Sequence, residues 1–181
     1  MKEEIIIAGF GGQGVLSMGK ILAYGGIMQD QEVAWLPSYG PEMRGGTCNV
    51  SVVLSDNKIS SPVLSKFDTA IILNQQSMDK FEKQVKPGGL LIYDTNGITR
   101  HPERTDIKIC RLDAAEEAIK MGNAKAYNMV VLGAYLKMKP VVTMENVLKG
   151  LKKSLPPRHH NLIPMNEQAI TVGMNAVEIV R

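Results

Sequence analysis

The sequence predicts an α/β fold: a three-layer sandwich in which helices cover a mostly parallel sheet. Three observations predict it. Short aliphatic runs alternate along the chain with longer segments of helical periodicity. The first such run leads through a glycine-rich turn into a helix, as in the first βα unit of a Rossmann-like fold. The 181 residues, 44% of them hydrophobic, suffice for one domain with a substantial core, and we expect a single domain over 1–181.

The first half of the chain begins with a β-branched run at 4–8, flanked by Gly9, which is typical of a buried strand. Apolar residues recur at helical spacing over 14–28, so a helix follows. Further strands are expected at 33–36, 49–54 and 68–73. Pro37 is expected to end the first of these, because proline cannot donate to a strand ladder. The turn at 55–57 leads into Lys58 and Ile59, which indicates a hairpin that would make the sheet mixed.

In the second half, Asn74 is placed to cap a helix over 75–85, which the sequence Pro87-Gly88-Gly89 ends. A strand at 90–93 stops at Asp94, and another is expected at 107–112. Beyond Asp113 the chain becomes helical, with helices predicted at 114–121, 126–138, 143–155 and 164–179. Thr143 is the expected cap of the third, and Pro164 suits the first turn of the fourth. The helix at 126–138 is apolar on several faces, which predicts that it is buried.

The stretch GFGGQG lies between the first strand and the first helix. Its glycines fit G-x-G-x-x-G in the required strand–turn–helix context, where free N–H groups at the helix start can bind an anion. The residues expected to bind a cofactor are Gly9, Gly11, Gly12, Gln13 and Gly14. The alternative is that the glycines only allow helix and strand to pack closely. The dinucleotide fingerprint also needs an acidic residue after the second strand, where this chain has Leu36-Pro37-Ser38.

A second candidate is the loop at 38–47, which carries opposite charges among glycines and a proline. The arginine of this loop offers a planar fork of donors suited to a carboxylate or a phosphate. We therefore expect the loop to face a partner subunit or a shared active site, through Tyr39, Glu42, Arg44, Gly45, Gly46 and Thr47. The alternative is an internal ion pair of Glu42 with Arg44 that only shapes the turn.

Catalytic residues are not evident in the sequence. His159 and His160 are adjacent and lack acidic or cysteine neighbours, so they do not predict a metal site, and His101 stands alone. Cys48 has no evident base and is expected to be a small buried residue. Asp94 ends a strand, a position that suits either a ligand contact or a turn cap.

Composition restricts the partners and the location. The net charge is only +3, and the basic cluster near 149–158 indicates a solvated helix face, so nucleic acid is not expected. Two isolated cysteines do not support a disulfide framework, a zinc site or a cubane iron–sulfur cluster, which needs about four thiolates. The short apolar run of MKEEIIIAGF is neither a signal peptide nor a membrane span, so a cytoplasmic location is expected.

Taken together, several stretches resemble the gamma subunit of 2-oxoacid:ferredoxin oxidoreductases. They are GFGGQGV, SYGPEMRGGTCNVSVVLSDNKISSP, FDTAIILNQQSMDKF, NMVVLGAYL and NEQAITVGMNA. The likeness covers essentially the whole chain, and its central stretch is the most specific part. The wording GPEMRGGT favours the 2-oxoglutarate and branched-chain types.

The resemblance implies an enzyme subunit that is not catalytic alone. In this family, alpha and beta subunits hold thiamine diphosphate with Mg, and iron–sulfur clusters lie in the beta subunit or a ferredoxin-like delta subunit. The gamma unit would bind no cofactor by itself, would help to close the shared active site and would contact coenzyme A. Ferredoxin would be reached indirectly. The expected reaction is oxidation of a 2-oxoacid, with 2-oxoglutarate favoured, to an acyl-CoA.

Three alternatives remain open from the sequence. The chain also resembles the small subunit of indolepyruvate oxidoreductase. It could be a stand-alone dinucleotide-binding oxidoreductase, although the ribose-binding acid is missing. It could also be a nucleotide- or CoA-binding module without an enzyme partner.

Overall fold

The computed structural model describes residues 1–41 and 46–181. Within these ranges seven strands form one sheet in the order β2-β3-β1-β4-β5-β6-β7. Their bounds are β1 Lys2–Phe10, β2 Glu32–Tyr39, β3 Thr47–Ser55, β4 Phe67–Ile72, β5 Val85–Asp94, β6 Lys108–Leu112 and β7 Glu178–Ile179. Strands β1, β4, β5 and β6 are parallel, whereas β3 runs antiparallel to β1 and β2, and β7 to β6. The predicted α/β class with a mixed sheet is confirmed.

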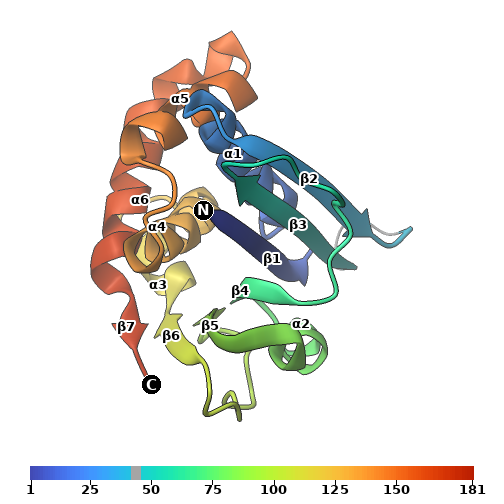
Figure 1. Ribbon diagram of the computed structural model, residues 1–181. Coiled ribbons are helices and arrows are strands. Elements are labelled where there is room, and N and C mark those ends of the chain that lie inside the picture. Colours follow the sequence, from blue (N-terminus) through green and yellow to red (C-terminus); the bar gives the residue numbers. More distant parts are fainter. Residues whose placement is uncertain (42–45) are drawn as a thin grey trace.

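The helices cover the two faces of the sheet unequally (Figure 1). They are α1 Val15–Met28, α2 Gln75–Phe81, α3 Ala114–Lys120, α4 Tyr127–Met138, α5 Met144–Ser154 and α6 Ile163–Ala176. Short 3-10 turns span Glu82–Gln84, Ala124–Ala126 and Pro157–Leu162. Helix α2 lies on one face, and the other helices lie on the opposite face. In the described part of the chain, no helix has both the length and the apolarity to cross a membrane.

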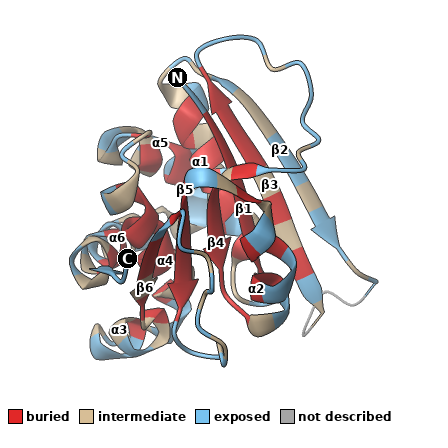
Figure 2. Cartoon of the chain, turned by 60° about the horizontal axis from the view of Figure 1, so that its bottom comes forward, coloured by how far each residue is buried: buried red, intermediate tan, exposed pale blue. Residues whose placement is uncertain are grey.

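Strand β1 explains why the sheet is covered on both sides. Its side chains alternate, so Ile5 and Ile7 point into the larger core with α1 and α4, whereas Ile6 and Ala8 point into the smaller core under α2. All four are at most 1% exposed. Figure 2 shows this central strand buried between its two ends, with exposed residues gathered on the outer helices, on β2 and on the loops.

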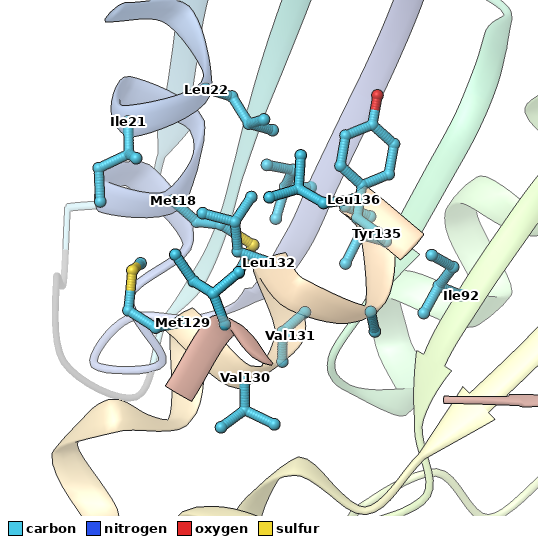
Figure 3. Packing of buried hydrophobic residues seen from close by; sticks show 14 of the residues in the cluster. Met18, Ile21, Leu22, Ile92, Met129, Val130, Val131, Leu132, Tyr135 and Leu136 are labelled. Carbon is cyan, nitrogen blue, oxygen red and sulfur yellow. The ribbon is translucent and has the colours of Figure 1, made fainter. Parts of the chain in front are cut away.

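Helix α4 is the centre of the larger core (Figure 3). Its residues from Met129 to Leu136 are all buried, which confirms the expectation that several of its faces are covered. Met18, Ile21 and Leu22 of α1 belong to the same buried cluster. A helix apolar on all sides needs such surroundings, because any exposed face would forfeit the gain from burial.

The predicted caps are confirmed. The side chain of Asn74 accepts a hydrogen bond from the N–H of Ser77 at the start of α2, and Thr143 accepts one from Asn146 at the start of α5. Pro164 lies in the first turn of α6, where its missing N–H leaves no intrahelical bond unmade.

Two predictions about β2 and its surroundings were wrong. Strand β2 does not stop at Pro37 but continues to Tyr39, with Pro37 opposite Val50 of β3. Because β2 is the outermost strand, proline costs less there than in a central strand. No hairpin forms at 55–59, since residues 56–66, all described, contain no strand. The sheet is mixed because β3 pairs antiparallel with both β2 and β1.

Two helix ends were also wrong. Helix α2 ends at Phe81 and a 3-10 turn follows, because Val85 already belongs to β5, opposite Phe67, and is 1% exposed. Strand β5 thus includes Pro87-Gly88-Gly89. The last helix ends at Ala176, and Glu178 pairs with Arg111 of β6 both along the strand and through a 3.1 Å ion pair.

Candidate functional site

The glycine loop joins β1 to α1 at the carboxyl end of β1. Gly12 has a φ of +100° and Gly14 a φ of +76°, a conformation that other residues rarely adopt. A β-carbon on Gly14 would also lie 2.4 Å from the side-chain nitrogen of Asn128 on α4. Above Gly12, by contrast, no atom of residues 1–41 or 46–181 lies within 4 Å of the position of a β-carbon. The loop is therefore tightly packed on its inner side and open at Gly12.

Gln13 holds the loop to the sheet. Its Oε1 accepts a hydrogen bond from the N–H of Phe10 at 2.6 Å, and its Nε2 donates to the carbonyl of Leu73 at 3.2 Å. Both ends of the amide are thereby used within the protein. Gln13 thus ties the end of β1 to the end of β4, and it also lines a cavity beside the loop.

The start of α1 has the features expected of an anion site. Gly14 is its left-handed N-cap, and among the described residues no side chain caps the first-turn N–H groups. A cavity of about 340 Å³ lies here, lined by residues of the glycine loop and the first turn together with Cys48. Burial raises the pKa of the Cys48 thiol, which favours its protonated form.

The structure brings the two sequence-predicted groups together. The N–H of Gly11 donates to the carbonyl of Gly46 at 2.8 Å, and Phe10 lies opposite Thr47 in the β1–β3 ladder. Tyr39, at the end of β2, is 55% exposed beside the same edge. The predicted residues Glu42, Arg44 and Gly45 lie outside the described residues. The base of the second loop thus forms a wall beside the glycine loop.

A larger cavity, of about 450 Å³, lies on the other side of the glycine loop, at the carboxyl ends of β1, β4 and β5. Phe10 and Gly12 belong to both cavities. The chain leaves β1 through α1 on one face of the sheet and leaves β4 through α2 on the other. Such a divergence opens the crevice in which α/β sheets commonly bind ligands.

Asp94, at the end of β5, forms the polar side of this cavity. Its Oδ1 accepts from the N–H groups of Asn96 and Ala114, and its Oδ2 accepts from the hydroxyl of Tyr127 at 2.6 Å. Burial raises the carboxyl pKa above its ordinary value, an effect that these hydrogen bonds reduce. The turn-cap role predicted for Asp94 is present, and the same residue also lines the cavity.

Tyr127 was not identified from the sequence, where it was only one of the apolar positions of α4. Burial and the neighbouring carboxylate raise its pKa well above the ordinary value, so it stays protonated and donates to Asp94. The two residues lie 33 positions apart, and only the packing of α4 beside β5 brings them together. No local sequence signal indicates such a pair.

The geometry also separates this site from a dinucleotide fold. In that fold the strand after the first helix lies next to the first strand and carries the ribose-binding acid. Here β3 lies between β1 and β2, so the end of β2 is displaced by one strand from the glycine loop. The nearest parallel neighbour of β1 is β4, which is followed by Leu73 and Asn74 rather than by an acid.

The histidines stay apart from both cavities. His159 and His160 lie in the 3-10 turn after α5, where His160 Nε2 is within 3.0 Å of the carbonyls of Lys152 and Leu155. Across residues 1–41 and 46–181, no group of three or more histidine, cysteine or acidic side chains is arranged to hold a metal ion.

Comparison with known proteins connects this architecture to a family. The model of the pyruvate ferredoxin/flavodoxin oxidoreductase family matches residues 4–176. The 2-oxoglutarate synthase subunit KorC of Methanocaldococcus jannaschii is 36% identical, over 86% of this chain and 85% of that protein. The ketoisovalerate oxidoreductase subunit VorA of Methanothermobacter thermautotrophicus is also 36% identical, over 94% of this chain. The chain spans only 35% of the length of that VorA.

Solved structures share the fold. A keto/oxoacid ferredoxin oxidoreductase gamma subunit from Geobacter sulfurreducens superposes with a TM-score of 0.78 at 28% identity, over 96% of each chain. The 2-oxoglutarate:ferredoxin oxidoreductase from Magnetococcus marinus, solved with 2-oxoglutarate, coenzyme A and succinyl-CoA, gives 0.85 at 22% identity. This chain covers 30% of that longer one. The family match over nearly the whole chain and the end-to-end likeness to KorC together show that the chain belongs to the pyruvate ferredoxin/flavodoxin oxidoreductase family.

Proposed function

We propose that residues 1–181 act as one gamma-type domain of a thiamine diphosphate-dependent 2-oxoacid:ferredoxin oxidoreductase. The observation that carries the proposal is the end-to-end similarity to a 2-oxoglutarate synthase subunit of similar length. It favours 2-oxoglutarate as the substrate, oxidised to an acyl-CoA while ferredoxin is reduced. Thiamine diphosphate, Mg and the iron–sulfur clusters belong to alpha, beta and ferredoxin-like delta subunits, and the complex is cytoplasmic.

Within that complex, the edge formed by the glycine loop and the base of the β2–β3 loop faces the shared active site. Two features support this assignment. Gly11 and Gly46 join the two loops through a backbone hydrogen bond, and Tyr39 presents an exposed aromatic ring beside them. Exposed aromatic residues are enriched where proteins meet. Gly46, the first described residue after Arg44, lies at this same edge.

We further propose that the start of α1 contacts a phosphate group of coenzyme A. No side chain in the described part of the chain caps the first-turn N–H groups, and the adjoining cavity of about 340 Å³ leaves room for a phosphate. A coenzyme A complex of a protein with this fold is consistent with such a contact. In this contact the chain would supply backbone N–H groups as hydrogen-bond donors to the phosphate, and no charged side chain would be involved.

The subunit assignment is tested by isolating the chain from its native cell and identifying co-purifying proteins by mass. We expect thiamine diphosphate-binding subunits to elute with it in fixed ratio. The chain expressed alone should be colourless and should not turn over 2-oxoacids. Elution of the native chain without such subunits, or a cluster spectrum of the lone chain, would contradict the assignment.

The coenzyme A contact is tested by Gly12→Val in the assembled enzyme. The valine would stand in the open space above the loop, where the phosphate is expected, and should raise the apparent KM for coenzyme A. Gly88→Val is a matched control, because Gly88 also has a positive φ, of +75°, and open space around its β-carbon position. Equal KM values for the two variants would contradict the coenzyme A contact and would mean that the glycines serve only the close packing of helix and strand.

A further inference from the structure

A third cavity lies beside β5 and β6 and has no role in the function proposed above. Its volume is about 200 Å³, and it shares no lining residue with the two cavities beside the glycine loop. The residues that line it are Tyr93, Thr95, Ile98, Thr99, His101 and Arg111. Small-molecule sites commonly measure roughly 300–1,000 Å³, so this cavity suits only a compact ligand.

The strand pairing places an arginine beside this cavity. Arg111 of β6 lies opposite Tyr93 of β5 and, on its other side, opposite Glu178 of β7. Residues that are opposite one another in neighbouring strands lie on the same face of the sheet, so the three form a row on the face that α2 covers. The Nε of Arg111 donates to Glu178 at 3.1 Å. A guanidinium has five N–H donors, so this ion pair leaves further donors for the cavity that Arg111 lines.

The loop after β5 supplies the other polar groups of the lining. Gln75 of α2 anchors this loop, because its Oε1 accepts from the N–H of Thr99 at 2.8 Å and from the hydroxyl of Thr99 at 3.2 Å. At the start of the loop, the N–H of Thr95 donates to the carbonyl of the last residue of β6 at 2.9 Å. The loop is thereby held so that Thr95 and His101 line the same cavity as Arg111.

The lining favours an anion over a cation. Arg111 is its one arginine or lysine, and none of the described residues that line it is acidic. The hydroxyl of Thr95 and the imidazole of His101 can each donate to an oxyanion. Arginine binds phosphate and carboxylate groups through paired N–H donors. The acids near Arg111, Glu178 and Asp113 among them, line a neighbouring cavity instead, and they should limit the affinity to about the millimolar range.

We propose that this cavity is a binding site for a compact oxyanion, either phosphate or the carboxylate of a small organic acid. The oxyanion accepts hydrogen bonds from the guanidinium of Arg111 and from the side chains of Thr95 and His101. The site is distinct from the phosphate contact proposed at the start of α1, because the two cavities share no residue. The inference does not depend on the proposed oxidoreductase function, since it concerns residues of this chain alone.

The test is a titration of the full chain with sodium phosphate, and separately with sodium acetate, at constant ionic strength. Amide chemical shifts are recorded at each step. At least one of the two ions should shift the signals of residues 95–101 and 111, with saturation in about the millimolar range. The ion that binds more tightly identifies the source of the oxyanion. Changes at residues 11–17 report the start of α1, so the same spectra distinguish the two sites.

Two variants that break the same ion pair should have opposite effects on binding. Arg111→Gln should weaken binding by at least about tenfold, because a charged donor is lost. Glu178→Gln should tighten binding by up to about fivefold, because the guanidinium no longer pairs with a competing carboxylate. Arg158→Gln is the control for the loss of one positive charge, because Arg158 is exposed and does not line the cavity.

The absence of a saturable shift at residues 95–101 with both ions would overturn the proposal. So would equal weakening in Arg111→Gln and Glu178→Gln, because both variants would then act only through the lost ion pair. Binding in Arg111→Gln that is unchanged, or that falls no further than in Arg158→Gln, would overturn it as well.

Discussion

Gly133 of α4 lies directly against the main-chain carbonyl of Ile170 on α6. A β-carbon on Gly133 would be 1.9 Å from that carbonyl oxygen, and one on Gly173 would be 1.8 Å from the carbonyl oxygen of Val130. The two helices therefore touch backbone to backbone in both directions. These glycines belong to NMVVLGAYL and NEQAITVGMNA, two stretches that carry the family resemblance. At these positions, the family resemblance therefore reflects the close contact between α4 and α6 and not a catalytic role.

We expect Gly133→Ala to lower the free energy of unfolding by about 1–3 kcal/mol or more, because the methyl group would force α4 and α6 apart. Denaturant titration of the purified chain measures the change. Gly40→Ala is the control, since no described atom lies within 4 Å of its β-carbon position and Gly40 is not among the glycines with a positive φ. Equal stability of Gly133→Ala and wild type would show that the helices separate without cost.

The sequence predicted most of the fold because the central strands and helices are determined by residues that are close together in the sequence. The run at Ile5–Ile7 is β-branched and buried, and Asn74 and Thr143 cap helices where their side chains can accept a backbone N–H. The errors arose where contacts between distant segments determine where a strand or helix ends. Pro37 stays in a strand because that strand is at the edge, and Val85 joins the sheet because its burial against Phe67 outweighs helix propensity.

Glu82 anchors the segment that follows β5. Its carboxylate, 8% exposed, accepts hydrogen bonds from the N–H groups of Glu103 and Arg104 and pairs with Arg100 at 2.8 Å. Glu82→Ala should lower the free energy of unfolding by about 1.5–3 kcal/mol, because two part-buried N–H donors and Arg100 lose a charged acceptor. Denaturant titration measures this loss.

The control for that change is Glu103→Ala. The Glu103 side chain is 79% exposed and lies 3.6 Å from Arg100, so its ion pair should contribute less than about 1 kcal/mol. A loss as large for Glu103→Ala as for Glu82→Ala would mean that charge, rather than the backbone contacts, holds the segment.

Both cysteines should react slowly in the native chain. Cys48 is 7% exposed and Cys110 is fully buried, and burial raises the pKa of each thiol. The thiolate is the reactive form, so labelling by a disulfide reagent at neutral pH should be slower than that of a free thiol and should reach the free-thiol rate in denaturant. Fast labelling of Cys48 in the folded chain would instead indicate an activated thiol beside the glycine loop.

The candidate site was only partly predictable. The sequence predicts the glycine loop because its residues are contiguous. It also predicts a second loop, which contains Gly46. Their hydrogen bond joins residues that are distant in sequence, so it follows from the β1–β3 pairing alone. The Asp94–Tyr127 pair could not be predicted either, because its two residues are also distant in sequence. The expectation that Gln13 binds a cofactor stays a prediction, and its amide also makes two hydrogen bonds within the chain.

Asp94 should give the stability of the chain a distinct pH dependence. Burial is the main cause of its raised pKa, Asp113 adds to it, and the hydrogen bonds from Tyr127, Asn96 and Ala114 oppose it. A carboxyl whose folded-state pKa lies above its ordinary value of 3.8 stabilises the fold when it is protonated. That contribution is complete below the ordinary value and is lost as the pH rises through the folded-state pKa.

Asp94→Asn removes this titration while keeping an acceptor for the two backbone N–H groups. The stability of the wild type relative to Asp94→Asn should therefore fall as the pH rises above 3.8, and then level off. Denaturant titrations of both chains, from below that pH to neutrality, measure the difference. Asp106→Asn is the opposite control, because Arg104 lowers the pKa of Asp106, whose contribution is present above the ordinary carboxyl value and is lost as the pH falls. A difference that rises with pH for Asp94 would mean that its hydrogen bonds outweigh its burial.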